Sequence, residues 1–130
     1  MGPVPGTSPI VPVRDVAQSV AFYSEMLGFD LSIHNADAGY ALLRRGPAMI
    51  ALIGGADERA LRATATNISA QIWLNDLDGY WDQIKDRADE FPAGSLRPPF
   101  DRDYGVRELH VKDPDGFLIF FTELTDSEKG

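Results

Sequence analysis

The stretch Pro-Val-Arg-Asp-Val-Ala-Gln-Ser-Val-Ala-Phe-Tyr-Ser-Glu-Met-Leu at residues 12–27 decides the fold, because its pattern returns later in the chain. Residues 73–88 read Trp-Leu-Asn-Asp-Leu-Asp-Gly-Tyr-Trp-Asp-Gln-Ile-Lys-Asp-Arg-Ala. Asp76 follows Asp15 by 61 residues, and the apolar positions behind the two aspartates keep that spacing. The apolar pairs are Val16 and Leu77, Val20 and Trp81, Tyr23 and Ile84, and Leu27 and Ala88. A pattern repeated at constant spacing indicates a supersecondary unit built twice.

The composition predicts a single soluble domain of 130 residues, with 44% apolar and 25% charged residues. The absence of cysteine excludes disulfides and thiolate chemistry. The net charge of −8 argues against nucleic acid as a partner and suits a cationic ligand, although solubility explains an acidic surface equally well. No apolar run reaches the ~18 residues of a membrane span and the N-terminus does not resemble a signal peptide, so we expect no membrane partner and a cytoplasmic protein.

Each half of the chain predicts the order β-α-β-β-β. Asp15 is expected to cap the first helix and Gly28 to end it, whereas Asp76 or Asp78 caps the second. The expected strands lie at residues 10–13, 29–33, 40–43, 48–53, 69–75, 91–95, 106–111 and 117–122. The inward face of the second helix is predicted to hold Leu77, Trp81, Ile84 and Ala88, which makes Trp81 a core residue.

Turn residues and polar segments divide the chain between these elements. Asp113-Pro114-Asp115-Gly116 predicts a type I turn closing a hairpin, and the apolar strand after it is expected to be covered on both faces. Within one overall domain, we predict a flexible arm at 1–7, a first βαβββ module at 8–54, a polar linker at 55–67 that could contain a helical turn, a second module at 68–124 and a tail at 125–130.

These features together resemble the vicinal oxygen chelate superfamily, which contains glyoxalases, bleomycin resistance proteins and extradiol dioxygenases. The segment Tyr104-Gly105-Val106-Arg107-Glu108 before the Asp113–Gly116 turn is similar to the bleomycin-resistance branch, as is Ile72-Trp73-Leu74 before Asp76. The resemblance implies an α+β fold in which two βαβββ repeats form a curled, mixed and antiparallel sheet cup. It also implies a homodimer whose cups hold small molecules.

Metal-dependent members of this superfamily hold their metal at four strand positions. The resemblance carries these positions onto Ser8, Ala51, Gln71 and Phe120. A transition metal needs imidazole, carboxylate or thiolate ligands, which this set does not supply. We therefore expect neither a metal nor another cofactor.

Strand alternation then predicts which side chains line the cup. The predicted ligand-binding residues are Met49, Gln71, Trp73, Tyr104, Glu108, His110 and Phe120. An aromatic lining with one acid and one imidazole suits a flat organic molecule bearing a cationic or hydrogen-bonding group. Trp73 could instead fill a core or a dimer interface, His110 could face solvent, and Glu108 could be a structural partner of an arginine.

The sequence favours a metal-free protein that sequesters a small organic molecule in a cup at a dimer interface. No catalytic residue is predicted, because Glu108 and His110, the one candidate acid–base pair, are expected ~7 Å apart along their strand, from a rise of ~3.3 Å per residue. An enzyme of the glyoxalase or dioxygenase type is the first alternative. An interaction module that has lost its ligand is the second.

Overall fold

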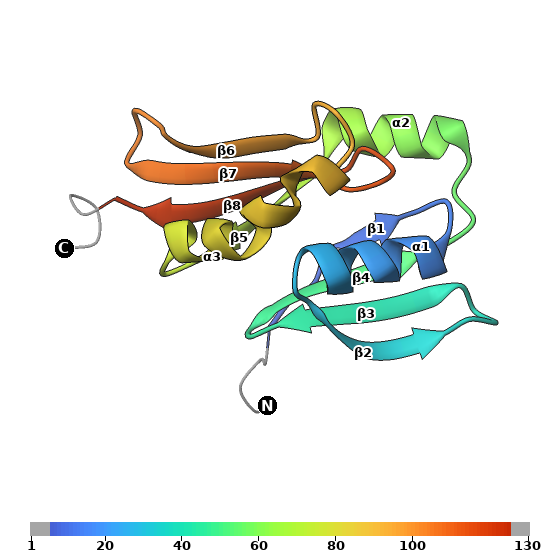
Figure 1. Ribbon diagram of the computed structural model, residues 1–130. Helices are drawn as coiled ribbons and strands as arrows, with labels where there is room; N and C mark the ends of the chain where they lie inside the picture. The colour runs from blue at the N-terminus through green and yellow to red at the C-terminus, as the bar shows by residue number, and fades with distance from the viewer. Residues whose placement is uncertain (1–5, 126–130) are drawn as a thin grey trace. The chain divides into compact units, whose positions relative to one another are not determined.

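The computed structural model describes residues 6–125, which form two βαβββ modules of similar construction (Figure 1). The chain divides into two compact units, of which the first ends at Asn67 and the second begins at Ile68. We call them the first and the second module and describe each by itself. The predicted α+β class with two mixed sheets is confirmed.

The first module contains one four-stranded sheet with the strand order β1-β4-β3-β2. Its elements are β1 (Ile10–Pro12), α1 (Val16–Ala21), the π-helical turn η1 (Phe22–Met26), β2 (Asp30–Asn35), β3 (Tyr40–Arg45), β4 (Ala48–Ile53) and α2 (Glu58–Asn67). The pairing of β1 with β4 is parallel, and the other two pairings are antiparallel. The polar linker expected at residues 55–67 contains the ten-residue helix α2 rather than a single turn. Leu61 is the buried side chain of α2, which explains why apolar periodicity did not reveal the helix.

The second module repeats this arrangement with the strand order β5-β8-β7-β6. Its elements are β5 (Ser69–Trp73), α3 (Leu77–Ile84), the 3-10 helix η2 (Lys85–Glu90), β6 (Leu96–Asp101), β7 (Val106–Lys112) and β8 (Leu118–Leu124). Strand β5 pairs with β8 in parallel, as β1 pairs with β4. The predicted Asp113–Gly116 turn is present, because the amide of Gly116 donates to the carbonyl of Asp113 at 2.9 Å.

The strand predicted at residues 91–95 is wrong. Residues 85–90 form η2, and the strand begins only at Leu96. Pro98 and Pro99 concealed it, because proline cannot donate a hydrogen bond to a neighbouring strand. Strand β6 accommodates both prolines at the edge of the sheet, where its register with β7 shifts between Arg97 and Phe100.

A buried core lies between the helix and one face of the sheet in each module. In the first module the fully buried ring of Tyr23 packs edge-on against Phe22 and Phe29, with centroids 5.5 and 5.9 Å away. Gly28 follows η1 and ends the helical segment of the first module, with a backbone φ of +76° in the left-handed region. In the second module the ring of Tyr80 lies 4.7 Å from that of Phe121.

Trp81 is only partly buried, so its predicted place in the core is wrong. The inward stripe of α3 runs through Leu77, Tyr80 and Ile84, which places Trp81 at the border of the stripe. The expectation that the last strand is covered on both faces is also wrong. Ile119 and Phe121 are buried, whereas Leu118 and Phe120 on the opposite face are half-buried.

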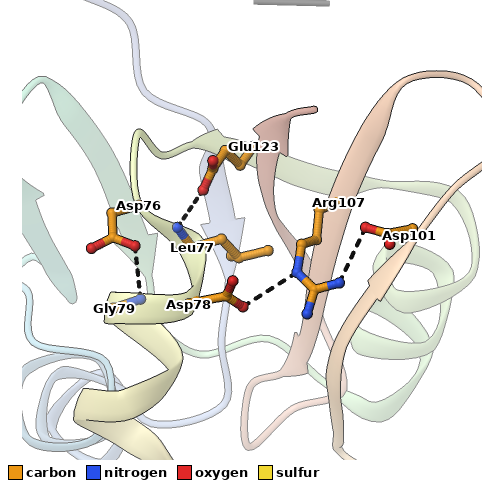
Figure 2. A network of polar contacts seen from close by, with 7 residues as sticks. All are labelled: Asp76, Leu77, Asp78, Gly79, Asp101, Arg107 and Glu123. Carbon is orange, nitrogen blue, oxygen red and sulfur yellow. Dashed lines mark hydrogen bonds and ion pairs between the residues drawn. The ribbon is translucent and has the colours of Figure 1, made fainter. Parts of the chain in front are cut away.

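A polar network fixes α3 to the sheet of the second module (Figure 2). The carboxylate of Glu123 on β8 accepts the amide of Leu77 at 2.6 Å. Arg107 on β7 bonds Asp101 at 3.1 Å and Asp78 at 3.2 Å. The hydrogen bond with Asp101, followed by that with Asp78, raises the pKa of Arg107, which favours its charged form. The start of α3 is thereby bonded to β8 and β7, and through Arg107 it is connected to β6.

Helices α1 and α3 begin with the predicted aspartate caps. The carboxylate of Asp15 accepts the amide of Gln18 at 3.2 Å, and that of Asp76 accepts the amide of Gly79 at 2.9 Å. Replacing either residue by alanine removes a partner from an otherwise unpaired amide. We expect Asp15→Ala and Asp76→Ala each to lower the free energy of unfolding by about 1 kcal/mol, measured by urea denaturation. Asp15→Asn and Asp76→Asn are the matched controls, since asparagine also caps helices; an equal loss in both kinds of variant would contradict the capping role.

Candidate functional site

One face of each sheet carries no helix, and we call it the helix-free face. The side chains on this face differ between the two modules. In the first module this face is mainly aliphatic, and Ile10, Ile33 and Ile53 are 68%, 48% and 40% exposed. In the second module the same face carries aromatic, amide and charged side chains. Alternation and strand pairing put Gln71, Trp73, Phe100, Glu108, His110, Phe120 and Thr122 on it.

Three rings cross the helix-free face of the second module. The imidazole of His110 lies between the rings of Phe100 and Phe120, with centroids 4.9 and 4.4 Å away and edge-to-face angles of 78° and 65°. Strands β6, β7 and β8 supply one ring each. All three residues are half-buried, so they form a fixed aromatic surface that retains accessible area.

Glu108 provides the buried charge in this cluster. Its residue is 3% exposed, and its Oε1 accepts a hydrogen bond from Nε2 of His110 at 2.9 Å. The guanidinium of Arg102 lies 3.7 Å from the same oxygen. A buried carboxylate is costly unless it is paired, and both partners come from the same module. Glu108 therefore holds the imidazole in one orientation.

The distance predicted between Glu108 and His110 is consequently wrong. The rise per residue separates their backbones by ~7 Å, but both side chains lean along the strand and meet. The pair thus has the geometry of an oriented base, with a carboxylate fixing the imidazole. In this arrangement the Nε2 of His110 is engaged by Glu108.

Gln71 and Trp73 on β5 extend the surface at the opposite edge of the sheet. Gln71 pairs across the strands with Phe120, and its side-chain amide donates to Oγ1 of Thr122 at 3.3 Å. Trp73 is 56% exposed, so it does not fill the core of its module. An exposed indole beside an ordered amide is suited to stacking against a flat molecule.

Six of the seven predicted ligand-binding residues lie in the second module. Gln71, Trp73, Glu108, His110 and Phe120 share its helix-free face, and Tyr104 approaches this face through Arg102, whose guanidinium carbon lies 5.0 Å from the tyrosine ring centroid. Met49 is half-buried on β4 of the first module, where its sulfur accepts a 3.1 Å contact from Arg44. The structure brings together the residues of the second module and leaves Met49 in a separate unit.

Sequence reasoning missed Phe100 and Arg97 in this cluster, whereas Arg102 belongs to a loop that the sequence placed at the rim of the cup. The guanidinium carbon of Arg97 lies 3.4 Å from the centroid of Phe100, and that of Arg102 lies 5.6 Å from it. The strand of Phe100 and Arg97 was predicted too early because of its two prolines, so their orientation could not be assigned. The order Arg97-Pro98-Pro99-Phe100, read as a bulged edge strand, would have been the signal.

The four positions of the superfamily's metal site do not supply a metal-binding set here. Gln71 pairs with Phe120, and the equivalent pair in the first module is Ile10 with Ala51. The first position is therefore Ile10 rather than Ser8, which precedes β1. Among residues 6–125, no group of three or more His, Cys, Asp and Glu side chains could hold a metal ion. We therefore assign no chemistry to a metal at these positions.

Two hollows on the surface of the described residues lie away from the ring cluster. One lies beside the start of α1 and includes Arg14, His34 and Asp37, and the other lies beside Trp81, Phe91 and Pro92. Neither contains a predicted ligand-binding residue. We base the candidate site on the ring cluster, because it combines aromatic area with a buried, oriented charge. None of the helices in the described part of the chain has the length and apolar character needed to cross a bilayer.

The fold defines a class of protein with tandem βαβββ modules, each with one sheet face free of helices. The family model described as glyoxalase/bleomycin resistance protein/dioxygenase superfamily matches residues 7–121. The chain belongs to this superfamily, as its motifs predicted.

Several characterised proteins are similar to the chain over most of its length. A bleomycin resistance protein from Geobacillus stearothermophilus is 31% identical over 132 aligned residues, which cover 92% of this chain and 96% of the relative. The crystal structure of the bleomycin-binding protein of Streptomyces verticillus with copper(II)-bleomycin matches with a TM-score of 0.73 and 25% identity, covering 95% of this chain and 98% of the other. A bleomycin resistance determinant encoded on transposon Tn5 matches with a TM-score of 0.71 and 26% identity, covering 91% and 96%. The predicted resemblance to the bleomycin-resistance branch is confirmed.

Removing the carboxylate of Glu108 tests whether it organises the cluster. We expect Glu108→Ala to lower the free energy of unfolding by about 1–3 kcal/mol, because His110 and Arg102 lose their buried partner. Glu108→Gln should cost less, since its amide oxygen can still accept from His110. Asp89→Ala, which removes an exposed carboxylate from the same module, is the control for urea denaturation. Equal stability of Glu108→Ala and Asp89→Ala would contradict the role of Glu108.

Proposed function

We propose that the protein sequesters a small aromatic organic molecule of the bleomycin type on the helix-free face of its second module. The observation that carries the proposal is the row of half-buried rings, Phe100, His110 and Phe120, held by the buried carboxylate of Glu108. Such a surface offers a flat ligand stacking and apolar contact without rearrangement of its side chains. Each ring pair contributes about 0.5–1.5 kcal/mol beyond the area it buries.

The relatives supply the choice of ligand. A bleomycin resistance protein is 31% identical to this chain, and a solved bleomycin-binding protein is 25% identical. Protection by sequestration needs only a complementary surface and a sufficient concentration of protein, because the bound drug cannot reach its target. The proposal requires no resident metal, in keeping with the side chains at Ile10, Ala51, Gln71 and Phe120.

The proposal includes a cytoplasmic homodimer with a ligand cup at the dimer interface, as the resemblance implies. The exposed isoleucines Ile10, Ile33 and Ile53 support association, because removing apolar area from water is worth about 25 cal/mol per Å². A cationic ligand was expected from the net charge alone. The cluster itself carries a paired carboxylate and two guanidinium groups, so its local charge gives that expectation no support.

Trp73 provides a direct test of ligand stacking. We expect bleomycin to quench the tryptophan fluorescence of the wild-type protein in a saturable way, since the ligand would cover the exposed indole of Trp73. Trp73→Phe should remove most of the change and weaken binding several-fold, whereas Trp81→Phe should keep both. The Trp81 variant is the matched control, because Trp81 lies on α3 and away from the helix-free face. Loss of the signal in Trp81→Phe alone, or no saturable change in the wild type, would refute the proposed site.

A second candidate function is acid–base catalysis, favoured by the 2.9 Å hydrogen bond between His110 and Glu108. An imidazole oriented by a carboxylate is the usual arrangement of a general base. Sequestration and catalysis differ in the fate of the ligand.

We expect bleomycin that has been incubated with the protein and released by denaturation to be chemically unchanged by mass spectrometry. His110→Ala should weaken binding, because the central ring of the row is lost, without altering the recovered compound. A product that accumulates with time in the wild type and is absent with His110→Ala would instead establish the enzyme.

A further inference from the structure

The charge on the helix-free face of the second module is opposite in sign to that of the whole protein. The chain has a net charge of −8. Strands β6 and β7 nevertheless contribute Arg97 and Lys112 to this face, and Arg102 reaches its buried carboxylate, Glu108. The nearby acids Asp101 and Glu123 point to the other side, where they bond Arg107 and the amide of Leu77. The helix-free face is therefore locally positive.

Arg97 is the guanidinium of this face that remains available to a ligand, and Lys112, the other exposed cation, has no planar fork of donors. Arg102 is paired with Glu108, whereas none of the carboxylates of residues 6–125 forms an ion pair with Arg97. Its guanidinium lies on the ring of Phe100 with the carbon 3.4 Å from the centroid, and the residue is exposed. Stacking covers one flat side of the guanidinium and leaves the N–H groups at its rim free to donate.

This geometry favours a planar anion. A guanidinium fork matches a carboxylate with two parallel N–H···O bonds, and its orientation on Phe100 limits the entropy lost on binding. Arg97 on β6 is in register with Gln71 on β5 at the other edge of the sheet, so about 14 Å separates their backbones across three strand spacings. A ligand of that length could stack on the rings and reach Arg97 with an acidic group.

We propose that the second module recognises an aromatic acid, with Arg97 as the residue that binds the carboxylate of the ligand. The inference rests on the proposed function, because it assumes that the helix-free face is the ligand surface. It adds a chemical class that the net charge does not suggest. Recognition of the anion distinguishes Arg97 from Arg102, whose charge Glu108 already balances.

Three small probes of one shape test the proposal. The anion 2-naphthoate, the neutral 2-naphthamide and the cation 2-naphthylmethylammonium are titrated into ¹⁵N-labelled full-length protein at low salt. Two-dimensional NMR follows the backbone amides of β6 and β7 and the two indole N–H signals. We expect 2-naphthoate to bind about tenfold more tightly than the cation, with shifts centred on Arg97, Phe100 and His110. Added salt should reduce the difference.

Arg97→Gln should remove the preference for 2-naphthoate and leave the weak binding of 2-naphthamide unchanged. Arg59→Gln makes the same change of charge on the exposed face of α2 in the first module and should leave the preference intact. Equal binding of anion and cation, tighter binding of the cation, or no shift with any probe would overturn the proposal, as would an unchanged preference in Arg97→Gln.

The outcome is separable from that of the proposed function. If bleomycin quenches Trp73 and the probes show no anion preference, the sequestration proposal stands and the inference about Arg97 is wrong. If 2-naphthoate binds through Arg97 and bleomycin does not bind, the recognition of aromatic acids stands and the choice of drug is wrong.

Discussion

Parallel pairing between the first and last strand of each module is the constraint on which the rest of the structure depends. Strand β1 lies beside β4, and β5 lies beside β8, with both strands of each pair running in the same direction. The first strand of each sheet lies at one edge and the second at the other, so the chain crosses the sheet between them, and a helix makes this crossing. That helix covers one face of the sheet and leaves the other to side chains that are not needed for the core. The helix caps, the buried stripe and the helix-free face are all consequences of this crossover.

The two modules use the same geometry for different purposes. Equivalent positions in the strand pairs hold Ile10 and Ala51 in one module and Gln71 and Phe120 in the other. The helix-free face is mainly aliphatic in the first module, where Tyr40 and Arg44 interrupt it, and combines rings with ionic groups in the second. Burial of aliphatic surface is favourable against any apolar partner that displaces water. An ordered imidazole, carboxylate and guanidinium instead favour a ligand in one orientation. The repeated unit thus presents two faces of the same geometry and different chemistry.

The elements that were predictable from sequence are those whose signals are local. The aspartate caps, Gly28 and the Asp113–Gly116 turn act within a few residues, and the inward stripe repeats with the helical period. Helix α2 was not predicted because its one buried leucine gives no apolar period. The position of β6 was predicted wrongly because of its two prolines. The contact between Glu108 and His110 depends on side-chain rotamers, which backbone spacing does not determine. Gln71, Trp73, Glu108, His110 and Phe120 could be placed on one face because strand alternation fixes it, whereas Tyr104 lies in the loop between β6 and β7.

The two prolines of β6 have a consequence for edge-to-edge association. Strands β6 and β2 are the corresponding outer strands of the two sheets, and only β6 carries adjacent prolines. At Pro98 and Pro99 the backbone offers no N–H to an incoming strand, and the shifted register bends the edge away from a regular ladder. Growth of the second sheet by addition of a foreign strand is therefore blocked at this edge, while β2 has only its own bulge as protection. The prolines thus protect from strand addition the edge that carries Arg97 and Phe100.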